Sequence, residues 1–503
     1  MTKYGAIQGM NEEGVFVWKG IPYAQPPIGD LRWRPPQKLA PWKGTFDAVS
    51  YGNICPQKAY GPQSIYEIPK EAMSEDCLYL NVWSPDPDPD EKLPVMVWIH
   101  GGSLTREGGS HPQYLGANLA KKGIVYVSIN YRLNIFGFLA HPELSAESPD
   151  NVSGNYGILD QIAALEWVRE NISSFGGDPD KVTIAGESAG GWSVTLLMAS
   201  PKAKGLFRQG ILQSGAYMWS GPDLKEESNQ YESGESEGLK FMGAMGVENL
   251  EELRQISSDK IVDHFFSSNS TVSGEPMIDG VVFPKKIDQI FAKGNHNKAD
   301  VIIGANADEW GLWVPQLPGE REGFINYIES NFGGDPSLFE QAYPIGDSLS
   351  IRKAYADYLS DDSFHLHDRL LAQEVNRGGN KVFQYYFSKV PSERYPEEYG
   401  AFHGAEIVYA LDNLENDPGT IGSGTITGED QAYADMVSAY WINFVKSGVP
   451  HGEDLPIWQV WDPKKQLYLE FGQRKIEMKS KLLFERLNAM EIYHLSRQKK
   501  VTN

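Results

Sequence analysis

The chain has 503 residues and carries 67 acidic against 45 basic side chains, a formal net charge of −22 at pH 7. This acidic balance argues against nucleic acid as a partner, because phosphate binding requires a basic face. No stretch approaches the ~20 consecutive apolar residues of a membrane span, and residues 1–5 lack the basic start and apolar core of a signal peptide.

The first part of the chain predicts short strands separated by turns and surface loops. Residues 6–9 and 15–20 contain apolar and β-branched side chains, and a proline-rich stretch follows at 21–36. Residues 75–83 alternate apolar and polar side chains, as in a half-buried strand. The Asp/Pro run at 85–90 is typical of a solvated connector.

Buried strands that alternate with helices are predicted from residue 94 onward. Residues 94–100 and 123–129 are near-continuous apolar runs, typical of parallel strands covered on both faces. Residues 155–172 have helical periodicity. Further strands are expected at 182–185, near 211–212, at 299–304 and at 381–387. The alternation predicts an α/β fold with a large central, mixed and mostly parallel sheet.

We expect a single catalytic domain over residues 1–503, since the sequence contains no internal repeat and no low-complexity linker. The segments at about 220–300 and 310–380 are helix-rich and irregular. Insertions of this kind lie over the carboxyl ends of the strands, where ligands bind. We therefore expect both segments to shape a pocket.

A strand, a tight turn and a helix-compatible run meet around Ser188. The segment Gly186-Glu187-Ser188-Ala189-Gly190 fits the Gly-x-Ser-x-Gly nucleophile elbow, in which a serine is held on a strained strand-to-helix turn. Five residues are a weak match by themselves, but this one has the flanking strand and helix that the motif requires. We predict that Ser188 is a catalytic nucleophile.

Such a serine needs a base to accept its proton and an acid to orient and stabilise that base. In α/β-hydrolases the order along the chain is serine, acid, histidine. His403 lies in a loop whose small neighbours allow close approach, so it is the candidate base. For the acid, the residues after the strand at 299–304 leave Asp308 and Glu309 as alternatives.

Backbone donors for an oxyanion are predicted directly after the strand at 94–100. His100-Gly101-Gly102-Ser103 matches an HGGG-type loop in three of its four places. Its N–H groups, together with that of Ala189, would form an oxyanion hole in which each donor contributes roughly 10²–10³-fold to the rate. In isolation, this loop could be an ordinary turn at the end of a strand. The nucleophile elbow at Ser188 favours the interpretation as an oxyanion loop.

Several longer motifs accompany these residues along nearly the whole chain. They lie at 19–24 with 31–33, 75–82 (Glu-Asp-Cys-Leu-Tyr-Leu-Asn-Val), 130–133, 154–161, 175–179, the elbow, and 212–215. With these motifs the chain resembles the type-B carboxylesterases, the carboxylesterase and cholinesterase group of α/β-hydrolases that includes bacterial p-nitrobenzyl esterases. Jointly the motifs are highly specific for that family.

The resemblance implies a Ser–Glu–His triad. It selects Glu309 as the acid, because the family's acid is the second residue of its Asp-Glu pair, and it matches His403 to the family's base. It also implies that the oxyanion donors are the N–H groups of Gly102, Ser103 and Ala189.

The same resemblance assigns roles to four further residues. Ser214 matches a serine that supports the triad, and Glu187 matches a buried acidic neighbour of the nucleophile. Cys55 and Cys77, the only two cysteines, fall where the family has its first disulfide. They form no CxxC motif or Cys/His cluster, so the sequence indicates no metal site.

Near the site, the chain departs from the usual family pattern. Ser103 replaces the third glycine or alanine of the oxyanion loop, and its side chain would narrow the site. Trp310 follows the acid where glycine is common, and Trp192 is unusually bulky; each would either shape the pocket or belong to the core. Arg106 would either favour an anionic group on the substrate or pair with Glu107 at the surface.

The sequence thus predicts a serine hydrolase of small-molecule carboxylic esters that acts through an acyl-enzyme, without cofactor or metal. An amide or carbamate hydrolase with the same triad is the alternative, and a non-catalytic binding homologue is disfavoured because all three triad residues are present. We expect a monomer or weak homodimer. The protein would be cytoplasmic or would have lost a leader, and we favour the secreted or periplasmic location.

Overall fold

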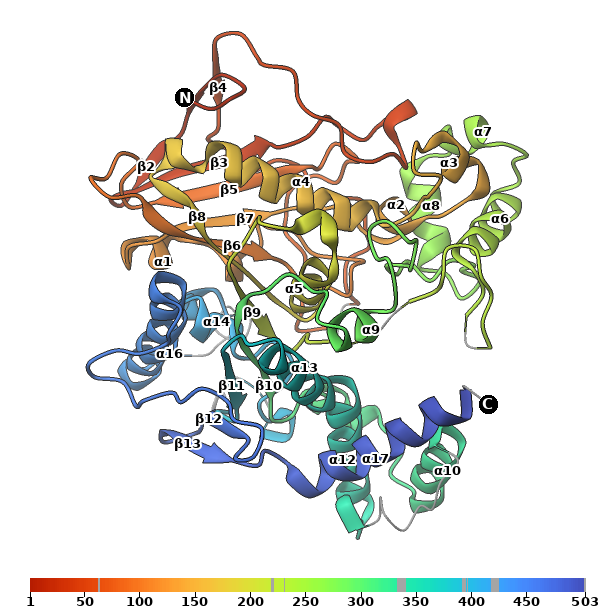
Figure 1. Cartoon of the computed structure of the whole chain (residues 1–503), viewed down its shortest axis with the longest axis vertical. Coiled ribbons are helices and arrows are strands. Elements are labelled where there is room, and N and C mark those ends of the chain that lie inside the picture. The colour runs from red at the N-terminus through yellow and green to blue at the C-terminus, as the bar shows by residue number, and fades with distance from the viewer. Residues whose placement is uncertain are drawn as a thin grey trace.

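The computed structural model describes residues 1–61, 64–218, 221–229, 231–332, 341–390, 395, 397–417 and 425–501. In this part of the chain an 11-stranded sheet runs through the molecule (Figure 1). Its strands, in spatial order, are β13 (Ile476–Ser480), β12 (Leu467–Phe471), β11 (Val382–Phe387), β10 (Asp300–Asn306), β9 (Gln209–Gln213), β8 (Gly177–Glu187), β6 (Leu93–Ile99), β7 (Val125–Ile129), β5 (Tyr79–Ser84), β3 (Val15–Pro22) and β2 (Met10–Glu12).

The middle of the sheet is parallel and its ends are antiparallel. Neighbouring strands run parallel from β12 through to β7, whereas β13 and the series β5, β3, β2 pair antiparallel. A separate parallel pair joins β1 (Ala6–Gln8) and β4 (Thr45–Asp47). This architecture confirms the predicted α/β fold with a large, mixed and mostly parallel sheet.

Side chains of the central strands enter two different cores because they alternate between the faces of the sheet. In β6, Val95, Val97 and Ile99 pack into one buried cluster, and Met96 and Trp98 pack into the other. All five are fully buried. The continuous apolar run at 94–100 therefore reflects a strand covered on both faces.

Helices supply the covering layers on each face (Figure 1). Residues of one set pack in the first cluster: α4 (Tyr156–Asn171), α5 (Ala189–Ala199), α9 (Ile287–Ala292) and α13 (Leu366–Arg377). Residues of the other set pack in the second cluster: α1 (Ala117–Lys121), α14 (Ile407–Ala410) and α16 (Gly428–Ser447).

The remaining helices build two smaller apolar clusters of their own. The first contains residues of α2 (Asn134–Phe138), α3 (Pro142–Glu147), α6 (Gly234–Met245), α7 (Leu250–Arg254) and α8 (Ser258–Phe265). The second contains residues of α10 (Arg321–Phe332), α12 (Ser348–Ser360) and α17 (Phe484–Val501). The segments predicted as helical insertions thus contain α6, α7, α8 and α9 in the first and α10, α12 and α13 in the second, although residues 333–340 lie outside the described chain.

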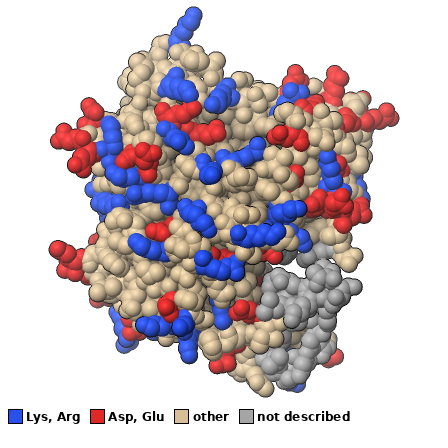
Figure 2. All heavy atoms as spheres, in the orientation of Figure 1, with Lys and Arg blue, Asp and Glu red and all other residues tan. Residues whose placement is uncertain are grey.

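Short helical turns connect these elements. They are η1 (Gly29–Leu31), η2 (Pro112–Tyr114), η3 (Ile172–Phe175), η4 (Pro201–Ala203), η5 (Gly311–Gln316), η7 (Glu397–Tyr399), η8 (Leu414–Asn416) and the π-helical turn η6 (Asp361–His365). Figure 2 shows that both signs of charge are spread over one face of the molecule, with basic side chains across its middle.

The parallel strands deliver the predicted site residues to one edge of the sheet. His100 directly follows β6, Ser188 follows β8, and Ser214 follows β9. Glu309 lies three residues beyond the end of β10. Because the carboxyl ends of neighbouring parallel strands meet at the same edge, residues far apart in sequence come together there.

A disulfide joins Cys55 to Cys77, with an S–S distance of 2.05 Å. Both sulfurs are buried, and Cys77 lies two residues before β5. Two residues past Cys55, the side chain of Gln57 hydrogen-bonds to the backbone N–H and C=O of Glu107. The disulfide thus anchors a loop that supports the segment after β6.

Replacing both Cys55 and Cys77 by alanine should lower the free energy of unfolding. Closing a loop over a separation of 22 residues restricts the unfolded chain by about 3 kcal/mol in the chain-entropy estimate. Urea unfolding followed by circular dichroism measures the loss. A reductant should destabilise the wild type and leave the double variant unchanged; equal stability of the two proteins would contradict this role.

Candidate active site

Ser188 lies on the sharp turn between β8 and α5, with φ +55° and ψ −123°. Residues other than glycine rarely adopt a left-handed φ, and they keep it only where their surroundings enforce it. A Cβ atom at Gly186 would lie 2.6 Å from the carbonyl oxygen of Ile99, and one at Gly190 would lie 2.0 Å from the same atom. The end of β6 therefore packs directly on the turn, and glycine is required at both positions.

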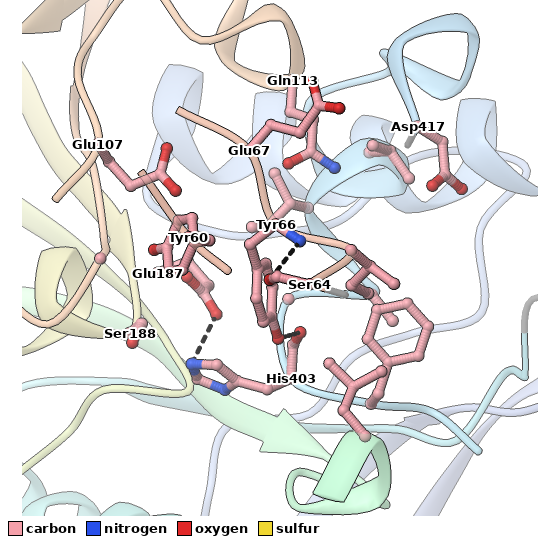
Figure 3. A pocket seen from close by; sticks show the side chains of 18 of the residues that line it. Tyr60, Ser64, Tyr66, Glu67, Glu107, Gln113, Glu187, Ser188, His403 and Asp417 are labelled. Atoms are coloured by element: carbon pink, nitrogen blue, oxygen red, sulfur yellow. Dashed lines mark hydrogen bonds and ion pairs between the residues drawn. The ribbon is translucent and has the colours of Figure 1, made fainter. Parts of the chain in front are cut away.

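The Ser188 side chain faces a cavity of about 410 Å³ (Figure 3). Its backbone N–H donates to the carbonyl oxygen of Gln213 at 2.9 Å, which fixes the turn on β9. Its hydroxyl makes no hydrogen bond to a described residue. The hydroxyl is thus positioned by the backbone and available to a molecule in the cavity.

A buried acid contacts the imidazole of His403. The Nδ1 atom of His403 lies 2.5 Å from Oε2 of Glu309. The other oxygen of Glu309 accepts hydrogen bonds from the Ser214 hydroxyl and the Asn306 backbone N–H, both at 2.6 Å. Glu309 is fully buried, so these donors hold its carboxylate in one orientation.

Asp308, the other candidate acid, points away from the imidazole. One of its oxygens accepts a hydrogen bond from the Ala401 backbone N–H at 3.0 Å, and the other pairs with Lys353 at 3.1 Å. Asp308 thereby holds the segment that leads into His403. The structure brings Glu309 to the imidazole, as the family resemblance implied.

The second imidazole nitrogen of His403 faces another carboxyl. Its Nε2 atom lies 3.2 Å from Oε1 of Glu187 (Figure 3), and the Tyr66 hydroxyl donates to the His403 carbonyl oxygen at 2.8 Å. Burial lowers the pKa of His403, but the carboxylates of Glu187 and Glu309 outweigh it and raise this pKa to about 10. The acidic surroundings therefore favour the imidazolium.

The carboxyls of Glu187 and Glu406 also lie near the imidazole, and they differ in the hydrogen bonds that they accept. Burial raises the pKa of Glu187 to about 8, and the nearby carboxyl of Glu406 adds to the effect. Glu406 accepts hydrogen bonds from the side-chain amides of Gln213 at 3.0 Å and Asn306 at 2.5 Å. The sequence did not indicate a role for Glu406. The one feature that could have suggested it is its position three residues after His403.

The predicted oxyanion loop presents free backbone donors to the cavity. Gly102 and Ser103 have left-handed φ angles of +82° and +57°, and both line the cavity. The N–H groups of Thr105 and Arg106 donate to the Gly102 carbonyl oxygen, which tightens the loop. Within the described chain, no acceptor binds the N–H groups of Gly102, Ser103 or Ala189, the first residue of α5.

Arg106 does not reach the cavity. Its guanidinium lies over the rings of Tyr60 and Phe266, at 5.0 and 4.3 Å from their centroids, and its Nε donates to the Lys58 carbonyl oxygen. Among the described contacts, it forms no ion pair with Glu107. Neither alternative suggested by the sequence for Arg106 matches this placement.

Trp192 and Trp310 also lie away from the cavity wall. Trp192 packs against the first core and meets the ring of Tyr217 edge-on at 5.8 Å. Trp310 packs with the cluster of α10, α12 and α17, and its ring lies 5.1 Å from that of Trp313. Trp313, which the sequence did not single out, lines the cavity.

Most of the cavity wall comes from segments that sequence reasoning did not associate with the site. Aromatic rings of Tyr60, Tyr66, Tyr114, Tyr399 and Phe402 line it. They belong to the loop that the disulfide closes between Cys55 and Cys77, to η2, to η7 and to the segment before His403. Such a wall suits a small, partly apolar molecule.

Within the described residues, no three His, Cys, Asp or Glu side chains are grouped so that they could hold a metal ion. No described helix is both long enough and apolar enough to cross a membrane.

Comparison with known proteins shows the family of the chain. The sequence model of the carboxylesterase family matches residues 1–490. The chain is 36% identical to a fumonisin B1 esterase of Sphingopyxis macrogoltabida over 94% of its length and 86% of that protein. It is also 36% identical to a para-nitrobenzyl esterase of Bacillus subtilis, over 90% of each chain.

Solved structures of related enzymes have the same fold. A p-nitrobenzyl esterase superposes with a TM-score of 0.81 at 32% identity, over 97% of this chain and 98% of that one. A carboxylesterase of Geobacillus stearothermophilus superposes with a TM-score of 0.82 at 31% identity, over the same shares. The chain therefore belongs to the carboxylesterase family and is a carboxylic-ester hydrolase.

Proposed function

We propose that Ser188, His403 and Glu309 form the catalytic triad of this hydrolase, which cleaves small-molecule esters through an acyl-enzyme on Ser188. The observation that carries the proposal is the 2.5 Å contact between Nδ1 of His403 and Oε2 of Glu309. A carboxylate at Nδ1 fixes the tautomer of the imidazole and stabilises the imidazolium that forms during catalysis. Nε2 is then left on the cavity side, where the nucleophile lies.

In the acylation step, the Ser188 oxygen attacks the ester carbonyl while Nε2 of His403 accepts its proton. Negative charge develops on the carbonyl oxygen, and the N–H groups of Gly102, Ser103 and Ala189 are the donors that would stabilise it. The imidazolium then gives its proton to the leaving alcohol, and the acyl group stays on Ser188.

Deacylation repeats these roles with water as the nucleophile. His403 accepts a proton from the water, the tetrahedral intermediate collapses, and the acid leaves as Ser188 regains its proton. We also propose that the segment after Glu309 helps to shape the pocket. Three residues of η5, Leu312, Trp313 and Gln316, line the cavity and support that role.

The carboxyl of Glu187 determines whether the imidazole of His403 is protonated when this cycle starts. A base must be neutral to accept a proton, whereas the Glu187 carboxylate at 3.2 Å favours the charged imidazole. The hydroxyl of Ser188 and the carboxyl of Glu187 are therefore alternative partners of Nε2. We propose that Nε2 moves from Glu187 to Ser188 when substrate binds, since catalytic contacts are often looser in unliganded sites.

Substituting Ser188 with alanine should reduce kcat for 4-nitrophenyl butyrate by roughly 10⁶-fold, because the nucleophile is lost. Release of 4-nitrophenolate measures the rate, and circular dichroism checks that the fold is kept. Ser174→Ala, at a serine outside the cavity lining, is the matched control and should retain wild-type turnover. Undiminished hydrolysis by Ser188→Ala would contradict the proposal.

An amide or carbamate hydrolase would use the same triad, so the leaving group needs a test of its own. Turnover of the matched anilide, N-butyryl-4-nitroaniline, should be far slower than that of the ester. Comparable kcat/KM values for the two substrates would instead favour the amidase alternative.

Glu187→Gln should shift the acidic limb of the pH profile of kcat/KM to lower pH by about one unit or more. The reason is that removing this carboxylate lowers the pKa of His403, so the neutral base persists at lower pH. Initial rates with a neutral ester across the acidic range measure the limb.

Glu406→Gln is the matched control for that shift. Its carboxyl binds Gln213 and Asn306 rather than the imidazole, so the limb should move less than in Glu187→Gln. An unmoved limb in Glu187→Gln, or a shift to higher pH, would show that Glu187 does not set the pKa of His403.

A further inference from the structure

Apart from the histidines His111 and His403, the ionisable groups of the cavity wall that carry charge are acidic. Glu67, Glu107, Glu187 and Asp417 line the cavity, and no lysine or arginine is among its described lining residues. Figure 3 shows Glu107 on the same side of the cavity as Glu187 and Ser188, with Asp417 across from them. Such a wall repels anions and attracts cations.

Glu107 is held in this wall by a strained backbone. Its φ of +83° lies in the left-handed region that favours glycine. The buried side chain of Gln57 fixes this conformation from both sides. It accepts a hydrogen bond from the Glu107 N–H at 2.7 Å and donates one to its carbonyl oxygen at 2.8 Å. A surrounding structure that enforces a strained residue is a sign of function rather than of stability.

The Glu107 carboxyl is buried but incompletely paired. Only 5% of the residue is exposed, and within the described chain its Oε2 has no hydrogen-bond partner. Its Cγ packs against the oxyanion loop, where a Cβ at Gly102 would lie 2.6 Å from it. The Tyr60 side chain hydrogen-bonds to this carboxyl, whereas the guanidinium of Arg106 is turned onto aromatic rings.

The unpaired oxygen of this buried carboxyl is free to accept a hydrogen bond from a molecule in the cavity. Burial raises the pKa of Glu107 to about 8, so in the empty cavity the group avoids an unpaired charge by keeping its proton. An ammonium group would donate a charge-assisted hydrogen bond to the carboxylate. The rings of Tyr60 and Tyr114, which line the same cavity, would add favourable contacts with a cation.

We propose that the preferred substrates of this enzyme are esters that carry a protonated amine, and that Glu107 is the residue that binds the ammonium group. The inference rests on the proposed function, because it assigns specificity to the cavity in which Ser188 acts. It makes Glu107 a specificity-determining residue and predicts that anionic esters are poor substrates.

Matched esters that differ only in charge test the proposal. For the acyl side, methyl 4-(dimethylamino)butanoate is compared with neutral methyl 5-methylhexanoate and with anionic monomethyl glutarate. For the alcohol side, 2-(dimethylamino)ethyl butyrate is compared with 3-methylbutyl butyrate. Acid release in a pH-stat at neutral pH gives kcat/KM for each ester.

In at least one pair, we expect the wild type to prefer the amine over its neutral isostere by about tenfold or more, the effect of one hydrogen bond to a charged group. Glu107→Gln, which keeps the size of the side chain, should abolish most of that preference. Glu107→Gly should do the same without backbone strain, and it covers the case in which Glu107→Gln fails to fold. Monomethyl glutarate should be the slowest acyl-side ester.

Glu67→Gln is the matched control, because it removes the same charge from an exposed side chain of the cavity wall. It should leave the ratio of amine to neutral ester nearly unchanged. A wild-type ratio near one in both pairs, or a ratio that neither Glu107 variant lowers, overturns the inference. If Ser188→Ala hydrolyses the neutral esters as fast as the wild type, the proposed triad fails instead.

Discussion

The close approach of the nucleophile turn to the end of β6 is the constraint on which the site depends. Because β6 and β8 are neighbours in the sheet, the carbonyl oxygen of Ile99 lies where any side chain at Gly186 or Gly190 would have to be. The same approach carries the segment after β6 over the nucleophile: a Cβ at Gly101 would lie 3.3 Å from the Cβ of Ser188. One steric requirement thus holds the serine in its strained conformation and brings the oxyanion loop beside it.

Much of the fold was predictable because short-range patterns determine it. The continuous apolar runs at 94–100 and 123–129 became the buried strands β6 and β7, and the periodic segment at 155–172 became α4. The nucleophile turn and the oxyanion loop were found in the same way, since each follows directly from the end of a strand. Local patterns could not choose between Asp308 and Glu309. These residues are adjacent, and which of them turns toward His403 depends on partners that come from distant strands and loops.

The specificity of the cavity was less predictable, because side-chain direction depends on contacts across the fold. The sequence shows a positive charge at Arg106 but not that its guanidinium is turned onto Phe266, 160 residues away along the chain. It shows a carboxyl at Glu107 but not the left-handed backbone that Gln57 enforces. The result is a reversal: from the sequence, the arginine was the candidate for contact with substrate, whereas in the structure its acidic neighbour faces the cavity.

The carboxyls around His403 are of two kinds. Some hold neighbouring side chains in place, and others are incompletely paired and can interact with a molecule in the cavity. Glu309 and Glu406 have hydrogen-bond donors for both oxygens, and these bonds hold the two carboxyls and their neighbours in place. Glu187 and Glu107 are less completely paired: Oε1 of Glu187 lies 3.2 Å from Nε2 of His403, and Oε2 of Glu107 has no hydrogen-bond partner in the described chain. Burial raises the pKa of both to about 8. Incompletely paired buried groups destabilise a fold. The presence of two such carboxyls at one cavity is therefore better explained by the molecule that enters the cavity than by the stability of the empty protein. The ionisation of Glu187 and Glu107 then depends on the occupant of the cavity, while Glu309 keeps the imidazole oriented throughout.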